Sequence, residues 1–197
     1  MKLVPRRLLG EETDIVPAMI QAASQAKIDV NRLRRNISVL TGSGGNIAVL
    51  TGKDGNLPIE TGFAVLGPRI ALALDRLSGD LITRLINTRW HVDHTRGNAW
   101  LHAAGAAITA HENTLKHLST STRVNEWNYT FPPAPAEALP TTIFHDAKRH
   151  RHNDTGVALS YCGPAHTDSD NSVVFEEADT NHGKSIYPTP CGLIGCR

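Results

Sequence analysis

The amino-acid sequence predicts one mixed α+β domain, and three observations support this class. Short apolar segments at 37–40, 47–50 and 57–60 are separated by glycine-rich or Lys-Asp-Gly-Asn turns, which is typical of a β-meander. A segment with helical periodicity follows from residue 68, and further strands alternate with short helices. At 197 residues, the chain is long enough for one domain with a substantial core.

The remaining elements follow from local signals. The helix that begins at Pro68 places Ile70, Leu74 and Leu77 on one face and ends before Gly79. The other predicted elements are a helical N-terminal extension within 1–35, a buried strand at 81–86, a helix at 98–104, a strand at 106–110, a helix to about 118, an irregular stretch at 120–140, and strands at 157–161 and 172–175. Meanders with helices between some strands suggest two sheets packed face to face under helical layers.

Composition excludes several classes of partner. The 20 Lys+Arg residues nearly balance the 19 Asp+Glu residues, and no basic stripe indicates nucleic acid. No apolar run reaches the roughly 18 residues of a membrane span, so no membrane partner is expected. The first residues lack the apolar segment of a signal peptide, which favours a cytoplasmic protein. Ten histidines favour metal chemistry, and the sequence does not indicate an oligomeric state.

A cluster of polar residues follows the predicted strand at 81–86. His91, Asp93 and His94 occupy four consecutive positions in a loop that ends at Gly97-Asn98. Imidazole and carboxylate are ligands that zinc prefers where it stays open to water. The alternative is a polar loop with two surface histidines, and such short motifs alone do not decide between the two.

The wider context resembles a known family. Residues 89–98, RWHVDHTRGN, resemble the H-x-H-x-D-H signature of the metallo-β-lactamase superfamily, with Arg89 in place of the first histidine. Residues 163–168 are similar to the segment that supplies the family's third histidine, here His166. Glu60-Thr61-Gly62 stands where the family commonly has Asp-Thr-Gly, whose carboxylate braces the metal-binding loops.

The resemblance implies an αββα metallo-β-lactamase-like sandwich that is incomplete at the C-terminus. It assigns residues 36–180 to that partial domain, between an extension at 1–35 and a divergent tail at 181–197. Truncation and a change of reading frame would both produce such a tail.

The resemblance also implies a metal site. The family holds one or two zinc ions, and His91, Asp93, His94 and His166 match its ligands, whereas Arg89 replaces one. A guanidinium group at 4 Å repels a dication by roughly 8 kcal/mol at an effective dielectric constant of 20. At most one zinc ion is therefore expected, provided that the long arginine side chain swings outward.

Two functions follow from these matches. The first is a zinc-dependent hydrolase whose metal-bound hydroxide attacks an ester, thioester or lactam-like bond of a small-molecule substrate, with His91, Asp93 and His94 as catalytic residues. The second is a non-catalytic truncated remnant with weak or no metal binding. Trp90 would line the substrate cleft or wedge the loop against the core. The basic run at 145–152 would be a solvated loop or, as the alternative, an anion-binding segment.

Overall fold

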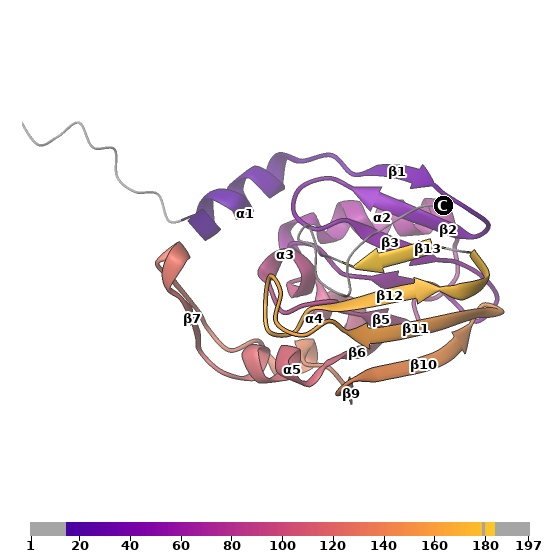
Figure 1. The fold of residues 1–197 in the computed structure, drawn as a ribbon. Helices are drawn as coiled ribbons and strands as arrows, with labels where there is room; N and C mark the ends of the chain where they lie inside the picture. The colour runs from indigo at the N-terminus through magenta and orange to yellow at the C-terminus, as the bar shows by residue number, and fades with distance from the viewer. Residues whose placement is uncertain (1–14, 179, 184–197) are drawn as a thin grey trace, which may run out of the picture.

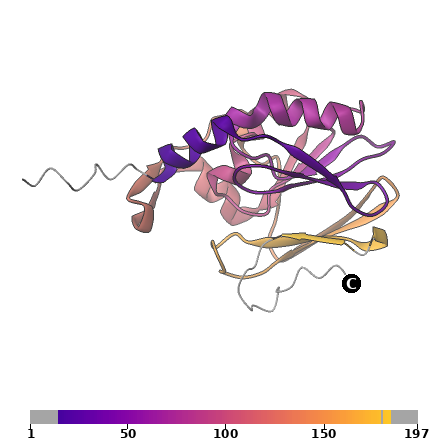
Figure 2. The same cartoon turned by 90° about the horizontal axis from the view of Figure 1, so that it is seen from above.

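The computed structural model describes residues 15–178 and 180–183 of the chain. A seven-stranded sheet and a four-stranded sheet lie face to face, and helices cover the outer face of the larger sheet (Figures 1 and 2). Within the described residues, no α-helix covers the outer face of the smaller sheet. The predicted α+β class and the face-to-face packing of two sheets are confirmed.

The larger sheet begins with the predicted meander and continues with parallel strands. Its order is β1 (Asp29–Arg32), β2 (Ile37–Thr41), β3 (Ile47–Leu50), β4 (Leu57–Ile59), β5 (Arg84–Ile86), β6 (Ala107–His111) and β9 (Thr142–Phe144). The first four strands pair antiparallel, and β4, β5, β6 and β9 pair parallel. The carboxyl ends of these parallel strands lie at the same edge of the sheet, and the loop after β5 begins there.

The helical prediction for the N-terminal extension holds only in part. Residues 15–25 form helix α1 (Ile15–Gln25), but Asp29–Arg32 form the edge strand β1. Backbone pairing with β2, with Val30 opposite Leu40, overrides a weak helical pattern there.

The smaller sheet contains β10 (Ala147–His152), β11 (Thr155–Tyr161), β12 (Asn171–Phe175) and β13 (Thr180–Gly183), all antiparallel.

The interpretation of 145–152 as a solvated loop is wrong, because most of this run is strand β10. Its outward arginines form ion pairs: Arg149 lies 2.5 Å from Glu176, and Arg151 lies 2.9 Å from Glu177. The tail predicted from 181 lies outside the described residues, apart from the 181–183 portion of β13.

Two apolar clusters hold the layers together. The cluster between the sheets includes Ile37, Leu57, Phe144, Leu159 and Phe175. The second cluster lies between the larger sheet and the helices, and its members include Val49, Phe63, Ile70, Leu74, Leu85 and Trp90. The helical face predicted from Pro68 onward is therefore confirmed.

The helices are short, and most match the predicted segments. They are α2 (Gly67–Leu77), α3 (Val92–Thr95), α4 (Asn98–Ala103) and α5 (Glu112–Ser119), with single 3-10 turns at Ala64–Leu66, Asn125–Trp127, Ala136–Ala138 and Glu176–Ala178. Among the helices of the described residues, none combines the length and the apolar character needed to cross a lipid bilayer.

Two predicted segments differ from the structure. The strand expected at 81–86 begins only at Arg84, and Leu81 is 76% exposed rather than buried. The stretch 120–140, expected to be irregular, contains a hairpin of β7 (Thr122–Val124) and β8 (Tyr129–Phe131).

Candidate metal centre

The loop after β5 is held by buried hydrogen bonds. Asn87 and Asn98 exchange side-chain amide bonds of 2.9 and 3.1 Å across the base of the loop. The Thr61 hydroxyl donates to the His94 carbonyl at 2.8 Å and accepts from the Gly97 amide at 3.0 Å. These bonds fix the short helix α3, and with it Asp93 and His94, at the edge of the sheet where the parallel strands end.

Asp93 and His94 are positioned as two ligands of one ion would be. Asp93 Oδ2 lies 3.1 Å from His94 Nε2. His94 is 5% exposed, and its two ring nitrogens face the carboxylates of Asp93 and Glu60. Two ligands at zinc distances in a tetrahedron are roughly 3.3 Å apart, so a shared ion would satisfy both groups.

Glu60 braces this pair from behind. Its carboxylate is fully buried, lies 3.3 Å from His94 Nδ1, and accepts a hydrogen bond of 2.8 Å from the Thr88 amide. A carboxylate on the far nitrogen of an imidazole orients the ring and increases its basicity toward a metal. Glu60 thus occupies the bracing position that the sequence resemblance gave it.

The charges of this cluster shift its ionisation. Burial alone would raise the pKa of Asp93, but the neighbouring His94 and Arg89 outweigh it and hold that pKa below its usual range. Burial lowers the pKa of His94, and the Glu60 and Asp93 carboxylates outweigh it, so this pKa is raised. Asp93 is therefore an anion at neutral pH, which is the form that binds metal.

His91 and His166 come together from distant parts of the chain. Their ring centroids are 4.8 Å apart with the planes at 86°. Burial lowers the pKa of His91 to about 3, with further lowering by the charges of His166 and Arg89. His91 is therefore a neutral imidazole at neutral pH, with the free electron pair that metal binding needs.

Arg89 does not swing outward, which was the arrangement in which the sequence left one zinc ion possible. Its side chain is 6% exposed, and Nη2 lies 3.9 Å from Asp93 Oδ2. Its Nε atom is buried and has no hydrogen-bond partner among the residues that the structure describes. The attraction of the Asp93 carboxylate keeps the guanidinium group inside, next to the candidate ligands.

The structure brings all four predicted ligands into one region, but as two pairs. Within the described part of the chain, no three His, Cys, Asp or Glu side chains converge closely enough to hold an ion as they stand. The donor chemistry, the Asp93–His94 spacing and the Glu60 contact fit one zinc ion. Arg89 in place of a third imidazole does not fit a two-ion centre. The assignment of these residues as ligands stays a prediction.

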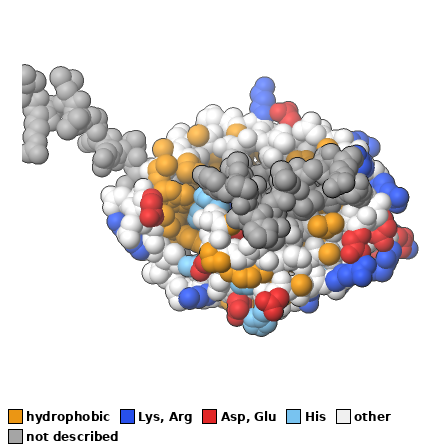
Figure 3. Space-filling view, viewed as in Figure 1, with side chains coloured by type: hydrophobic (Ala, Val, Ile, Leu, Met, Phe, Trp, Pro, Cys, Tyr) orange, Lys and Arg blue, Asp and Glu red, His pale blue; other side chains and the backbone are white. Residues whose placement is uncertain are grey.

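A cleft of about 370 Å³ opens beside His91 and His166. Sequence reasoning missed its far wall, the β7–β8 hairpin, which contributes Arg123, Glu126 and Trp127. The Trp127 ring lies 4.8 Å from that of His91. Alternation of Thr122, Val124, Tyr129 and Phe131 around a polar turn was the signal available for this hairpin. Figure 3 shows hydrophobic side chains gathered beside exposed histidine between α1 and the hairpin.

Trp90 has both of the roles that the sequence left open. Its ring lines the cleft, yet it is only 6% exposed and packs edge-on against Phe131 at 5.4 Å. It also stacks on His117 at 4.8 Å, and Asp168 holds that histidine through a 2.8 Å contact.

Comparison with protein families identifies one match. The model described as the metallo-beta-lactamase superfamily matches residues 40–191. Among curated proteins, none matches significantly.

Solved structures with the same fold are numerous. The subclass B3 metallo-beta-lactamase MEM-A1 from a soil metagenome library is 18% identical with a TM-score of 0.66, over 77% of this chain and 59% of that one. The class B3 di-zinc enzyme LRA-12 from an Alaskan soil metagenome is 22% identical with a TM-score of 0.66, over 78% and 59%. A Cronobacter sakazakii metallo-beta-lactamase with a HARLDQ motif is 18% identical with a TM-score of 0.69, over 89% and 69%. This chain thus spans 59% of the length of the first two structures.

Proposed function

The chain belongs to the metallo-β-lactamase superfamily, and we propose that it is a zinc-dependent hydrolase of that fold with reduced efficiency. Its substrate is a small molecule with an ester, thioester or lactam-like bond. The observation that carries this proposal is the meeting of His91 with His166 at a cleft, with 4.8 Å between their ring centroids. Asp93 and His94 lie near enough for their charges to act on His91.

In this proposal His91 and His166 would hold one zinc ion, with Asp93 or His94 as the third ligand. A bound zinc ion supplies Lewis acidity: it lowers the pKa of water toward about 7 and polarises a carbonyl oxygen. The family's use of zinc and the di-zinc description of LRA-12 support this choice of metal.

The chain's own residues prepare the site. Glu60, fixed by Thr88, holds the His94 ring in one orientation. Burial keeps His91 neutral, so no proton has to leave before it binds a metal. Trp127 and Trp90 form apolar walls next to His91 and exclude water from one side of a bound substrate. Arg89 opposes the metal and accounts for the reduced efficiency.

A second candidate function is a non-catalytic domain with weak or no metal binding. The observation that favours it is the position of Arg89. Its side chain is enclosed, and its guanidinium group faces Asp93, as a metal ion bound there would. In this case Arg89 neutralises the Asp93 carboxylate, and the fold persists without a metal.

Hydrolysis assays separate the two candidates. The purified protein would be tested with a p-nitrophenyl ester, an acyl thioester and a chromogenic cephalosporin, before and after treatment with a chelator and after zinc is restored. The hydrolase predicts turnover of at least one substrate that disappears on chelation and returns with zinc. His166→Ala should abolish it, whereas His145→Ala should not, because His145 is exposed and paired with Glu112 at 2.9 Å. Absence of zinc-dependent turnover with all three substrates favours the non-catalytic candidate.

A further inference from the structure

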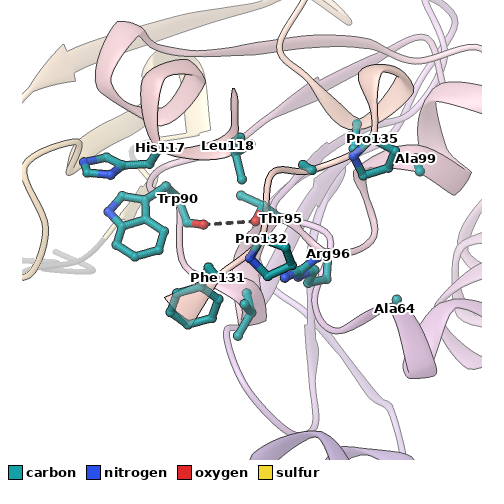
Figure 4. A pocket seen from close by; sticks show the side chains of 13 residues that line it. Ala64, Trp90, Thr95, Arg96, Ala99, His117, Leu118, Phe131, Pro132 and Pro135 are labelled. Atoms are coloured by element: carbon teal, nitrogen blue, oxygen red, sulfur yellow. Dashed lines mark hydrogen bonds between the residues drawn. The ribbon is translucent and has the colours of Figure 1, made fainter. Parts of the chain in front are cut away.

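A second cavity lies next to the metal-binding loop but does not include its ligands. It has a volume of about 190 Å³, and its walls are largely apolar (Figure 4). Trp90 and His117 border both this cavity and the cleft, but His91 and His166 border only the cleft. The apolar wall is formed mainly by Trp90, Leu118, Phe131, Pro132, Pro135 and Ala138.

Arg96 provides the only full positive charge on this wall, and no carboxylate lines the cavity. The residue is half-buried, and Figure 4 shows its side chain beside Pro132 at the wall. Among the residues that the structure describes, none forms a hydrogen bond or an ion pair with its guanidinium group. Arg96 also borders a neighbouring apolar cavity of about 240 Å³ beside Phe63 and Tyr129.

A partly buried guanidinium group without an anion favours a ligand that supplies one. Arginine binds carboxylates through two parallel hydrogen bonds, which are strengthened where water is excluded. The volume of the cavity sets the size of the ligand: a cavity of roughly 150 Å³ holds benzene. About 190 Å³ therefore accommodates one aromatic ring with a short substituent.

We propose that this cavity binds a small aryl carboxylate, with its ring against Trp90 and Phe131 and its carboxylate on Arg96. Offset or edge-to-face contact with these two rings suits an aromatic body. The site is separate from the candidate metal centre, so it does not depend on zinc. The bound ring lies against Trp90, which also contacts the His91 ring at 4.5 Å.

Calorimetric titration with phenylacetate, in the presence of a chelator, tests the proposal on the full chain. The chelator removes any contribution of a metal to carboxylate binding. Phenylacetate should bind at one equivalent, and the neutral analogue 2-phenylacetamide should bind about tenfold more weakly or worse, since it lacks the charge. Arg96→Gln should weaken phenylacetate binding about tenfold and remove the difference between the two probes.

Three variants control the result. Arg76→Gln, exposed on α2, should change affinity by less than about twofold. Ala99→Leu fills the cavity and should weaken both probes without loss of the folded circular-dichroism spectrum. Arg123→Gln, in the cleft, should have no effect. The proposal is overturned by no binding at 20 mM, by equal binding to Arg96→Gln, or by loss of binding in Arg123→Gln.

Discussion

The guanidinium group of Arg89 lies 3.9 Å from the carboxylate of Asp93, and their side chains are only 6% and 14% exposed. In the proposed zinc site, this pair places a fixed positive charge beside a candidate ligand. Burial lowers the pKa of His91 to about 3, and the charge of Arg89 adds to this lowering. Burial would raise the pKa of Asp93, but His94 and, to a lesser extent, Arg89 hold it below its usual range. The charge of Arg89 also repels a metal ion. We therefore expect Arg89 to limit how tightly the proposed site binds zinc.

Replacement of Arg89 by histidine should raise zinc affinity at least about tenfold, which corresponds to about 1.4 kcal/mol. The change removes the repulsion and adds an imidazole donor. Arg89→Gln removes only the charge and should give an intermediate value. Arg76→Gln, exposed on α2, is the matched control. Zinc titrations of the four proteins measure this, and equal affinities would show that Arg89 does not limit the site.

Glu60 should be required for stability as well as for metal binding. It is fully buried at a φ of +78°, and its carboxylate contacts Thr88 and His94. Glu60→Ala leaves these partners unsatisfied and should cost about 3–5 kcal/mol of unfolding free energy. Glu60→Gln keeps an acceptor for Thr88 and should cost about 1–2 kcal/mol.

Urea unfolding checks both values, with the exposed Glu137→Ala as control, expected to change stability by less than about 0.5 kcal/mol. A Glu60→Ala protein as stable as the control would contradict the bracing role.

Stability should fall as pH drops from about 6.5 to 4, partly because of His150. Burial, with the charges of Arg84, His152 and Lys148, lowers the pKa of His150 to about 4. The contribution is fully present above the unfolded pKa near 6.5. It is lost as pH falls toward 4, because only the unfolded chain binds a proton there. After a discount for a half-exposed ring, we expect about 1 kcal/mol.

His150→Gln should reduce the fall in unfolding free energy between pH 7.5 and 4, measured by urea unfolding. His145 provides a control of opposite sign. The Glu112 carboxylate raises the pKa of His145, so its contribution is present at low pH and lost as pH rises. If the pH dependence of the unfolding free energy is unchanged in His150→Gln, the partly buried, neutral His150 does not contribute to it, which would contradict this prediction.

The packing of the two sheets predicts a large cost for Phe175→Ala. Phe175 lies on β12, is fully buried and faces the apolar cluster between the sheets. Its loss should cost about 3–5 kcal/mol of unfolding free energy. Leu72→Ala, on the exposed face of α2 at 50% exposure, should cost less than about 0.5 kcal/mol. Similar costs for the two would contradict the two-sheet core.

The sequence predicted the elements whose patterns are local. The meander at 37–59 and the helix from residue 67 rest on turn signals and on apolar periodicity, and both are in place. Strands β1 and β10 were missed, because all four side chains of β1 are exposed and because β10 is largely polar and rich in basic residues, with exposed and more buried side chains in alternation. Pairing with a neighbouring strand defines them, and a single sequence does not display that pairing.

The candidate site shows the same division. His91, Asp93 and His94 were proposed as ligands from their spacing, and His166 only through the resemblance to a family; their role as ligands stays a prediction. The inward position of Arg89 could not be predicted, because it depends on attraction to Asp93 in an enclosed site. Trp127 contacts His91 because the β7–β8 hairpin packs beside it, and this tertiary contact is not visible in the sequence.

Zinc titration of the unaltered chain and of His166→Ala, by calorimetry with metal analysis, tests the candidate metal centre most directly. We expect one zinc ion per unaltered chain, weakly bound, and at least about tenfold weaker binding in His166→Ala, with His145→Ala unchanged. An unaltered chain that binds no zinc, or a His166→Ala protein that binds it equally well, would contradict the assignment of His91 and His166 to one metal site.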